Sequence, residues 1–233
     1  MNAKTHTSPA PVVCLEGPSA VGKTTLAAAL ARECGARVVP ELDAASPPPI
    51  PQSAAWFVEQ SAARWRRARA EAASVPFVVL DGDPFKGLWY NWVYAEEGWQ
   101  DVNVLAPRYR AHIERHALAF PDLYVLLDAD ESQLRRRREA DTTRRRRNFE
   151  KHLRLVEPLR RYFDALREAA PARVLLLDTS AQKNLTGEVL RALHNLPHDE
   201  PDSARLLEHI AAWLRAQPPV APAAKHEPDE RTR

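Results

Sequence analysis

The hydrophobic pattern along the chain consists of short apolar runs that alternate with longer segments of helical periodicity. Five runs have four or five residues each. Strands that are apolar along their whole length are typical of a parallel sheet buried on both faces by the helices that connect its strands. The expected strands cover residues 12–15, 37–40, 77–80, 123–127 and 174–177, and the expected helices cover residues 23–33, 54–73, 106–118, 184–194 and 202–216. The pattern predicts one three-layer α/β domain with a five-stranded parallel sheet flanked by helices.

The two ends of the chain lack this periodicity. Residues 1–11 and 217–233 are rich in proline, alanine and charge, and we expect both to be flexible tails around a domain at residues 12–216. A hydrophobic content of 45% in 233 residues excludes disorder throughout. No apolar run reaches the ~18 residues that cross a bilayer, no secretory signal is visible, and two cysteines cannot build a disulfide framework. We therefore expect a soluble, cytoplasmic protein without a membrane partner.

Charge changes this picture only locally. The chain has 33 Lys and Arg against 31 Asp and Glu, a formal net charge of +2, which is small for a general nucleic-acid binder. Arginine is nevertheless concentrated at residues 135–138 and 144–147. We expect no nucleic acid among the partners, and the arginine cluster requires a different explanation.

The residues after the first apolar run match a phosphate-binding motif. Residues 17–24 read Gly-Pro-Ser-Ala-Val-Gly-Lys-Thr, the G-x-x-x-x-G-K-[ST] pattern, between an expected strand and an expected helix. Glycines in this pattern let backbone amides turn toward phosphate oxygens, and the helix N-terminus adds its positive dipole end. Lys23 supplies charge to the β- and γ-phosphates, and Thr24 offers a hydroxyl to Mg²⁺. We expect ATP and Mg²⁺ here, bound by Gly17, Ser19, Ala20, Val21, Gly22, Lys23, Thr24 and Thr25.

Three stretches resemble the P-loop small-molecule kinases of the deoxynucleoside kinase and thymidylate kinase group. They are the strand and loop at 13–25, the sequence Val-Pro-Glu at 39–41, and the sequence at 121–130 that leads into the arginine-rich segment. The resemblance covers about residues 12–180. It implies a P-loop NTPase fold with an arginine-rich lid at about residues 135–150.

Three carboxylates are candidates for the chemistry of phosphoryl transfer. The resemblance implies that Glu41, after the second strand, accepts the proton of an attacking hydroxyl. Asp81 follows the third strand, and we expect it to hold Mg²⁺ directly or through water, while Asp83 could share the metal or act as the base. These kinases usually carry an acidic residue followed by Arg at this point, whereas this chain reads Asp-Gly-Asp-Pro at 81–84. The missing arginine leaves the nature of the acceptor open.

The arginine-rich segment lies where the lid of these kinases would sit. Arginines that close over a transferring phosphoryl group neutralise the charge of the transition state and help to exclude water. Four consecutive residues fan around a helix, so at most two of each quartet can face the phosphate. Arg137 and Arg138 are the expected contacts.

Aromatic and amide side chains are candidates for the acceptor site. Residues 85–94 are dense in aromatic rings, and Phe85 or Trp89 could stack on a planar acceptor. Gln60 resembles the position at which these kinases hydrogen-bond a base, and Arg64 is a weaker candidate on the same expected helix.

The combined features predict an ATP- and Mg²⁺-dependent kinase that transfers the γ-phosphate to a hydroxyl or phosphate of a small molecule, with a nucleoside or nucleotide as the expected acceptor. An antibiotic or another hydroxyl-bearing compound stays open as the acceptor. A nucleotide-binding regulatory ATPase and an RNA-binding protein that uses the arginine cluster are the alternatives from other classes. A homodimer is left open.

Overall fold

A five-stranded parallel sheet forms the centre of the structure, which is a computed structural model that describes residues 9–41, 49, 53–97, 100–142 and 149–220. The strands are β1 (Val12–Glu16), β2 (Arg37–Val39), β3 (Val78–Asp81), β4 (Leu123–Asp128) and β5 (Val174–Asp178). Their order is β2-β3-β1-β4-β5, and every neighbouring pair is parallel. The sheet predicted from the apolar runs is confirmed. Because β1 lies between β3 and β4, the segments that follow β1 and β3 leave the sheet side by side.

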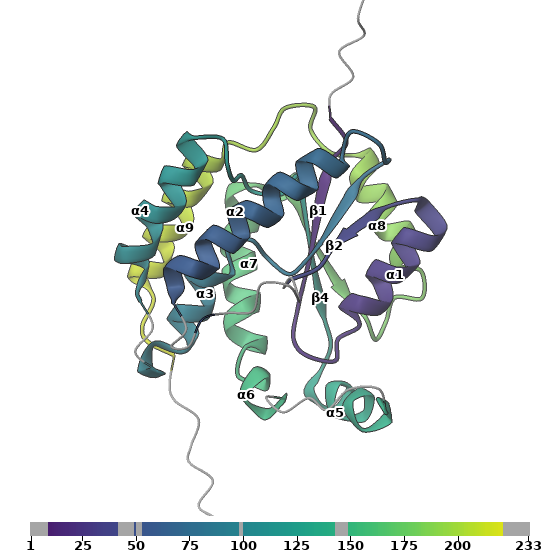
Figure 1. The fold of residues 1–233 in the computed structure, drawn as a ribbon. Helices are drawn as coiled ribbons and strands as arrows, with labels where there is room; N and C mark the ends of the chain where they lie inside the picture. Colours follow the sequence, from purple (N-terminus) through teal and green to yellow (C-terminus); the bar gives the residue numbers. More distant parts are fainter. Residues whose placement is uncertain (1–8, 42–48, 50–52, 98–99, 143–148, 221–233) are drawn as a thin grey trace, which may run out of the picture.

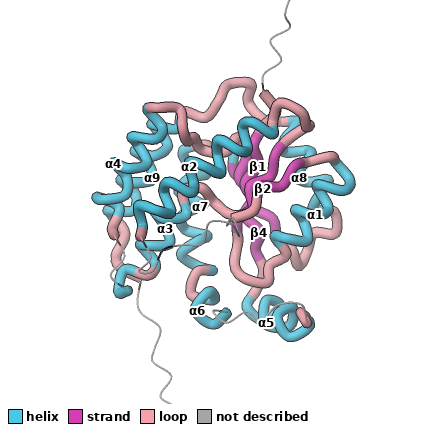
Figure 2. Tube along the Cα trace, viewed as in Figure 1, coloured by secondary structure: helices cyan, strands magenta, loops and turns pink. Residues whose placement is uncertain are grey.

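Helices cover both faces of the sheet (Figure 1, Figure 2). The helices are α1 (Lys23–Cys34), α2 (Ala54–Glu71), α3 (Lys86–Val93), α4 (Val102–Glu114), α5 (Glu131–Ala140), α6 (Phe149–Leu153), α7 (Val156–Ala169), α8 (Leu185–His194) and α9 (Ser203–Ala216), with short 3₁₀ turns η1 (Ala95–Glu97) and η2 (Pro171–Arg173). Val13 and Leu15 of β1 pack in the core shared with α1 and α8, whereas Val12 and Cys14 pack in the core shared with α2, α3, α7 and α9. This alternation of successive side chains explains why the strands are apolar throughout.

Helices α4 and α7 are among those that differ from the pattern expected from the sequence. The helix expected at 106–118 begins earlier, at Val102, because the Asp101 side chain accepts hydrogen bonds from the amides of Asn103 and Val104. It ends at Glu114, because the left-handed φ of 53° at His116 is incompatible with a continuing α-helix. Helix α7 is not among the helices expected from the sequence. Its buried apolar residues nevertheless recur at helical spacing (Leu159, Tyr162, Phe163 and Leu166).

The packed part of the chain extends slightly beyond the limits expected from composition. Ala10 packs against the core, and the Pro11 carbonyl accepts a hydrogen bond from the Val78 amide. At the other end the Trp92 indole donates to the Pro218 carbonyl, and Val220 packs against the core. In the described ranges, no helix combines the length and the apolar character needed to cross a membrane.

Helix α9 is an integral part of the core, and its loss should be measurable. Leu207 is fully buried between α9 and its neighbours, so Leu207→Ala should lower the free energy of unfolding by about 2–5 kcal/mol. Leu190, on α8, is 42% exposed, and Leu190→Ala should cost less than about 1 kcal/mol. Urea unfolding of the two variants provides the comparison, and equal losses would contradict the packing of α9.

Candidate active site

The loop between β1 and α1 has the backbone shape of a phosphate-binding loop. Its φ angles are left-handed at Gly17 (147°), Ala20 (70°) and Gly22 (111°). Gly17 also has no room for a side chain, because a Cβ there would lie 2.4 Å from the Leu127 carbonyl oxygen. Helix α1 begins at Lys23, so its first amides, which have no partner within the helix, face the space enclosed by the loop. The loop and the helix end together have the geometry of an anion-binding site.

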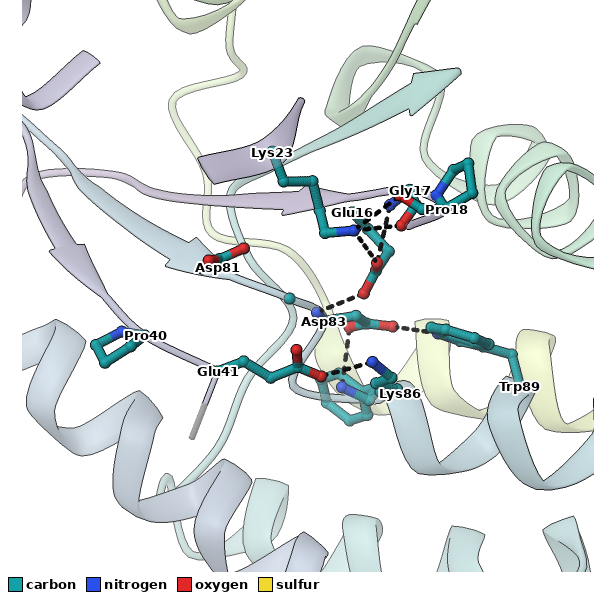
Figure 3. A network of polar contacts seen from close by, with 12 residues as sticks. Glu16, Gly17, Pro18, Lys23, Pro40, Glu41, Asp81, Asp83, Lys86 and Trp89 are labelled. Atoms are coloured by element: carbon teal, nitrogen blue, oxygen red, sulfur yellow. Dashed lines mark hydrogen bonds and ion pairs between the residues drawn. The ribbon is translucent and has the colours of Figure 1, made fainter. Parts of the chain in front are cut away.

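Lys23 folds back over this loop (Figure 3). Its ammonium group donates to the Gly17 carbonyl and, at 3.3 Å, to the Pro18 carbonyl. The same group lies 3.8 Å from a carboxylate oxygen of Glu16. A cation held against carbonyl oxygens at the rim of an anion site is in position to transfer its contacts to phosphate oxygens.

Glu16 is a buried carboxylate that sequence reasoning did not assign a role. It is 2% exposed, and its two carboxylate oxygens accept hydrogen bonds from the Gly17 amide at 2.8 Å and from the Asp83 amide at 3.0 Å. Glu16 therefore joins the start of the phosphate-binding loop to the segment after β3. The available signal was an acidic residue that ends an otherwise apolar strand directly before the first loop glycine.

All eight loop residues expected to bind ATP line one cavity of about 810 Å³. The cavity is also lined by Glu41, Asp81, Trp89 and Arg137, so the structure brings these expected site residues together. Thr24 and Asp81 contribute a hydroxyl and a carboxylate, and burial raises the pKa of Asp81. Oxygen ligands of this kind fit Mg²⁺, which keeps several waters and binds through one or two protein groups together with substrate phosphates.

Glu41 and Lys86 form an ion pair at the edge of this cavity. The Lys86 ammonium lies 2.5 Å from a Glu41 carboxylate oxygen (Figure 3). Burial opposes ionisation of Glu41, but the charge and hydrogen bond of Lys86, helped by Lys23 and Arg64, outweigh it and lower the Glu41 pKa to about 2. Glu41 is therefore ionised at neutral pH. Lys86 was not among the candidates that sequence reasoning selected.

Gly82 explains why the arginine expected after Asp81 is absent. Its φ of 94° is left-handed, and a Cβ at this position would lie 3.2 Å from the carboxylate carbon of Glu41. A side chain there would be strained and would press on Glu41. The cation that faces Glu41 instead comes from Lys86, in the first position of α3.

Asp83 occupies a structural position. Its carboxylate is 2% exposed and accepts hydrogen bonds from the Phe85 amide, the Trp89 indole and the Tyr124 hydroxyl, at 2.9–3.0 Å. Burial raises its pKa to about 6, against the effect of the donors. With these donors around it, the carboxylate anchors the start of α3. This geometry contradicts the expectation that Asp83 shares the metal, because Asp83 does not line the cavity that contains Thr24 and Asp81.

A second cavity of about 310 Å³ lies between α2 and α3. It is lined by Gln60 and Arg64 from α2 and by Tyr90 and Asn91 from α3. Arg64 also donates to the backbone carbonyls of Pro40, Asp81 and Gly82, so it braces the ends of two strands. The two cavities share three lining residues, which are Glu41, Lys86 and His152.

The two aromatic candidates occupy different places. Phe85 is fully buried and stacks on Phe120 with ring centroids 3.9 Å apart, so the expectation that it stacks on an acceptor is wrong. Trp89 is 1% exposed, and its indole is fixed by Asp83. It lines the larger cavity without lining the smaller one, so it forms part of the wall beside the phosphate-binding loop.

The two lid arginines also differ. Arg137 lines the larger cavity and donates to the carbonyl oxygens of Val21 and Thr179, which ties α5 to the loop and to the segment after β5. Arg138 is exposed, packs over the Phe149 ring and lies 3.4 Å from Glu150, so the expectation that it contacts phosphate is not supported. The arginines at 144–147 lie outside the described residues.

Three solved structures of similar fold are kinases. A deoxyadenosine kinase from M. mycoides with bound dATP superposes with a TM-score of 0.52 at 11% sequence identity, covering 78% of this chain and 98% of that one. The same enzyme with the products dCMP and dCDP gives 0.52 at 12% identity, covering 79% and 100%. Thymidylate kinase from Candida albicans gives 0.52 at 14% identity, covering 83% and 98%.

The chain has the fold of the P-loop nucleoside and nucleotide kinases. The expected P-loop NTPase fold and the resemblance to this group are thereby confirmed at the level of the fold. No protein-family model matches the sequence, and no curated protein matches it significantly. At this low identity the shared fold does not define the reaction, which must be argued from the site.

The position of Asp83 gives a stability prediction. Asp83→Ala leaves the Phe85 amide, the Trp89 indole and the Tyr124 hydroxyl without their buried acceptor, and each such donor costs about 1–3 kcal/mol. The free energy of unfolding should therefore fall by about 3 kcal/mol or more, measured by urea unfolding. Asp164→Ala, which removes a surface carboxylate paired with Arg167, should cost less than about 1 kcal/mol. If Asp83→Ala lowered the free energy of unfolding no more than Asp164→Ala does, the structural role of Asp83 would be contradicted.

Proposed function

We propose that this protein is an ATP-dependent phosphotransferase that moves the γ-phosphate to a hydroxyl or phosphate of a small molecule. The larger cavity is the donor site for ATP, and the smaller cavity is the acceptor site. The observation that carries the proposal is their junction at Glu41, Lys86 and His152. A donor and an acceptor bound on the two sides of this junction would meet beside a carboxylate.

The donor assignment rests on the loop at residues 17–24. Its left-handed turns, the N-terminus of α1 and the Lys23 ammonium converge on one cavity, and this combination suits a triphosphate. Arg137 lines the same cavity and connects the loop to the segment after β5. It would hold the donor cavity in shape from the lid side.

Thr24 and Asp81 would hold Mg²⁺, which neutralises charge on the β- and γ-phosphates when it is bound. Glu41 is the base. Its carboxylate is ionised at neutral pH and lines both cavities, so it can accept the proton of a hydroxyl that enters from the acceptor side. A weak base is sufficient because phosphoryl transfer has a loose transition state that depends mainly on positioning and charge.

The acceptor cavity favours a transferase over a regulatory ATPase. Slow hydrolysis needs only water beside the γ-phosphate, whereas this chain has a separate cavity of about 310 Å³ joined to the donor cavity. That volume lies in the range of small-molecule sites. The structural neighbours are themselves described as deoxyadenosine kinase and thymidylate kinase, which supports a nucleoside or nucleotide as the acceptor class. An antibiotic or another small alcohol would use the same arrangement.

Removal of the loop lysine should abolish transfer. Lys23→Ala removes the charge that faces the β- and γ-phosphates, so binding of Mg²⁺–ATP should weaken by about 100-fold, equivalent to about 3 kcal/mol. Calorimetric titration with Mg²⁺–ATP measures the change. The control is Arg191→Ala, which removes a surface cation paired with Glu188 on α8 and should leave binding unchanged. Unaltered ATP affinity in Lys23→Ala would refute the donor site.

The metal assignment predicts a change in magnesium demand. Asp81→Asn keeps the shape of the side chain and removes its charge, so the Mg²⁺ concentration for half-maximal transfer should rise by roughly tenfold, with a smaller change in the KM for the acceptor. A chelator such as EDTA should stop transfer by the unaltered protein. Measuring ADP release across a Mg²⁺ series checks both statements, and a Mg²⁺ requirement equal to that of the unaltered protein would count against Asp81.

A further inference from the structure

The acceptor cavity has walls suited to an uncharged ring compound. Phe57, Tyr90 and Leu105 contribute apolar surface, and Gln60 and Asn91 contribute amide groups. Sites for small molecules commonly combine apolar walls with a few polar groups that fix orientation. The part of the acceptor that fills this space is therefore a planar or apolar body with a small number of hydrogen-bonding edges.

The charges around the cavity balance one another among the described residues. The lining includes two carboxylates, Glu41 and Asp83, and two permanent cations, Arg64 and Lys86. Burial and the nearby charges of Lys86 and Lys23 lower the pKa of His152, which favours its neutral form. Residues 42–52, which follow Glu41 in the chain, include no Lys or Arg.

Both cations already have acceptors. Arg64 donates to three backbone carbonyls, and its guanidinium holds the ends of β2 and β3. Lys86 is paired with Glu41 and lies beside the Trp89 and Tyr90 rings, 5.6 and 5.7 Å from their centroids. At Gly82, where an additional cation would be expected, a side chain would be strained by the left-handed φ of 94° and would press on Glu41.

A phosphate monoester would bring a charge of about −1.5 to −2 into this balanced site. Among the described lining residues, Arg64 and Lys86 would have to give up their present acceptors to meet that charge, so desolvating it there is unfavourable, and the carboxylate of Glu41 would repel it. A neutral hydroxyl has no such penalty and can donate its hydrogen bond to Glu41.

We infer that the acceptor presents an uncharged hydroxyl group to Glu41, and that the Lys86–Glu41 pair excludes phosphate monoesters by keeping the acceptor cavity electrically balanced. The inference rests on the proposed function and narrows its substrate class from hydroxyl or phosphate to hydroxyl. Lys86 is then a specificity-determining residue, because its positive charge balances the negative charge of Glu41 and is not free to bind an anionic ligand.

The test of turnover uses matched compounds. The four 2′-deoxynucleosides, the four ribonucleosides and small aromatic alcohols are each supplied as the free alcohol and as the phosphate monoester, and ADP formation is measured with Mg²⁺–ATP. The expected result is that kcat/KM for an accepted alcohol exceeds that for its monoester by at least 100-fold. Turnover of monoesters at rates equal to or above those of the alcohols would overturn the inference while leaving the phosphotransferase proposal intact. Absence of Mg²⁺–ATP binding would instead refute the proposed function.

A second test changes the charge balance directly and measures binding without turnover. Glu41→Gln leaves Lys86 without its counter-charge, so calorimetric affinity for the monoester of the accepted alcohol should rise at least tenfold, whereas affinity for the alcohol should not rise. Glu41→Gln/Lys86→Met restores the balance and should remove the gain. Thermal unfolding of both variants verifies that they are folded. No gain in Glu41→Gln, or a gain that persists in the double variant, would overturn the role of Lys86.

Discussion

The buried carboxylate of Glu16 is the constraint on which the geometry of the site depends. One oxygen accepts the first amide of the phosphate-binding loop, and the other accepts the Asp83 amide, so a single side chain fixes the segments after β1 and β3 relative to each other. Burial makes this fixation strong, because a polar group out of water is stable only when it is hydrogen-bonded. Asp83 then extends the connection to Phe85, directly before α3, and to Trp89 within it. Lys86 is the first residue of α3, so its position follows from these contacts.

The donor and acceptor sides of the site handle charge in opposite ways. On the donor side, backbone amides, a helix N-terminus and Lys23 concentrate positive potential where a highly charged phosphate chain would bind. On the acceptor side, the positive charge of Lys86 is matched by Glu41 within hydrogen-bonding distance. The two environments meet at the same carboxylate. Under the proposed function, a ligand of the larger cavity would be selected by charge, and a ligand of the smaller cavity would be selected by shape and neutral hydrogen bonding.

The features that could be predicted from sequence are those encoded by local pattern. The five strands and the loop at residues 17–24 follow from apolar runs and from glycine spacing, and the structure places them as expected. The roles of Glu16, Lys86 and Asp83 could not be read in this way. Each depends on contacts between segments far apart in the chain, such as the separation of 45 residues between Lys86 and Glu41. Such contacts depend on the register of β3 against β1 and on the backbone turn at Gly82, which periodicity does not encode.

The arginine-rich segment illustrates the same limit for charged residues. Arg135 is held by Glu131 and Glu150 at the surface, and Arg138 by Glu150 and the Phe149 ring, whereas Arg137 alone of these three lines the donor cavity. Surface pairs of this kind contribute little to stability, but they orient the guanidinium groups. Helix α5 turns one face toward the loop. Arg137 lies on that face and connects the helix with Val21 and Thr179, whereas Arg135 and Arg138 form ion pairs at the surface. These identical residues therefore make different contacts, and the helix phase relative to the sheet decides which of them reaches the larger cavity.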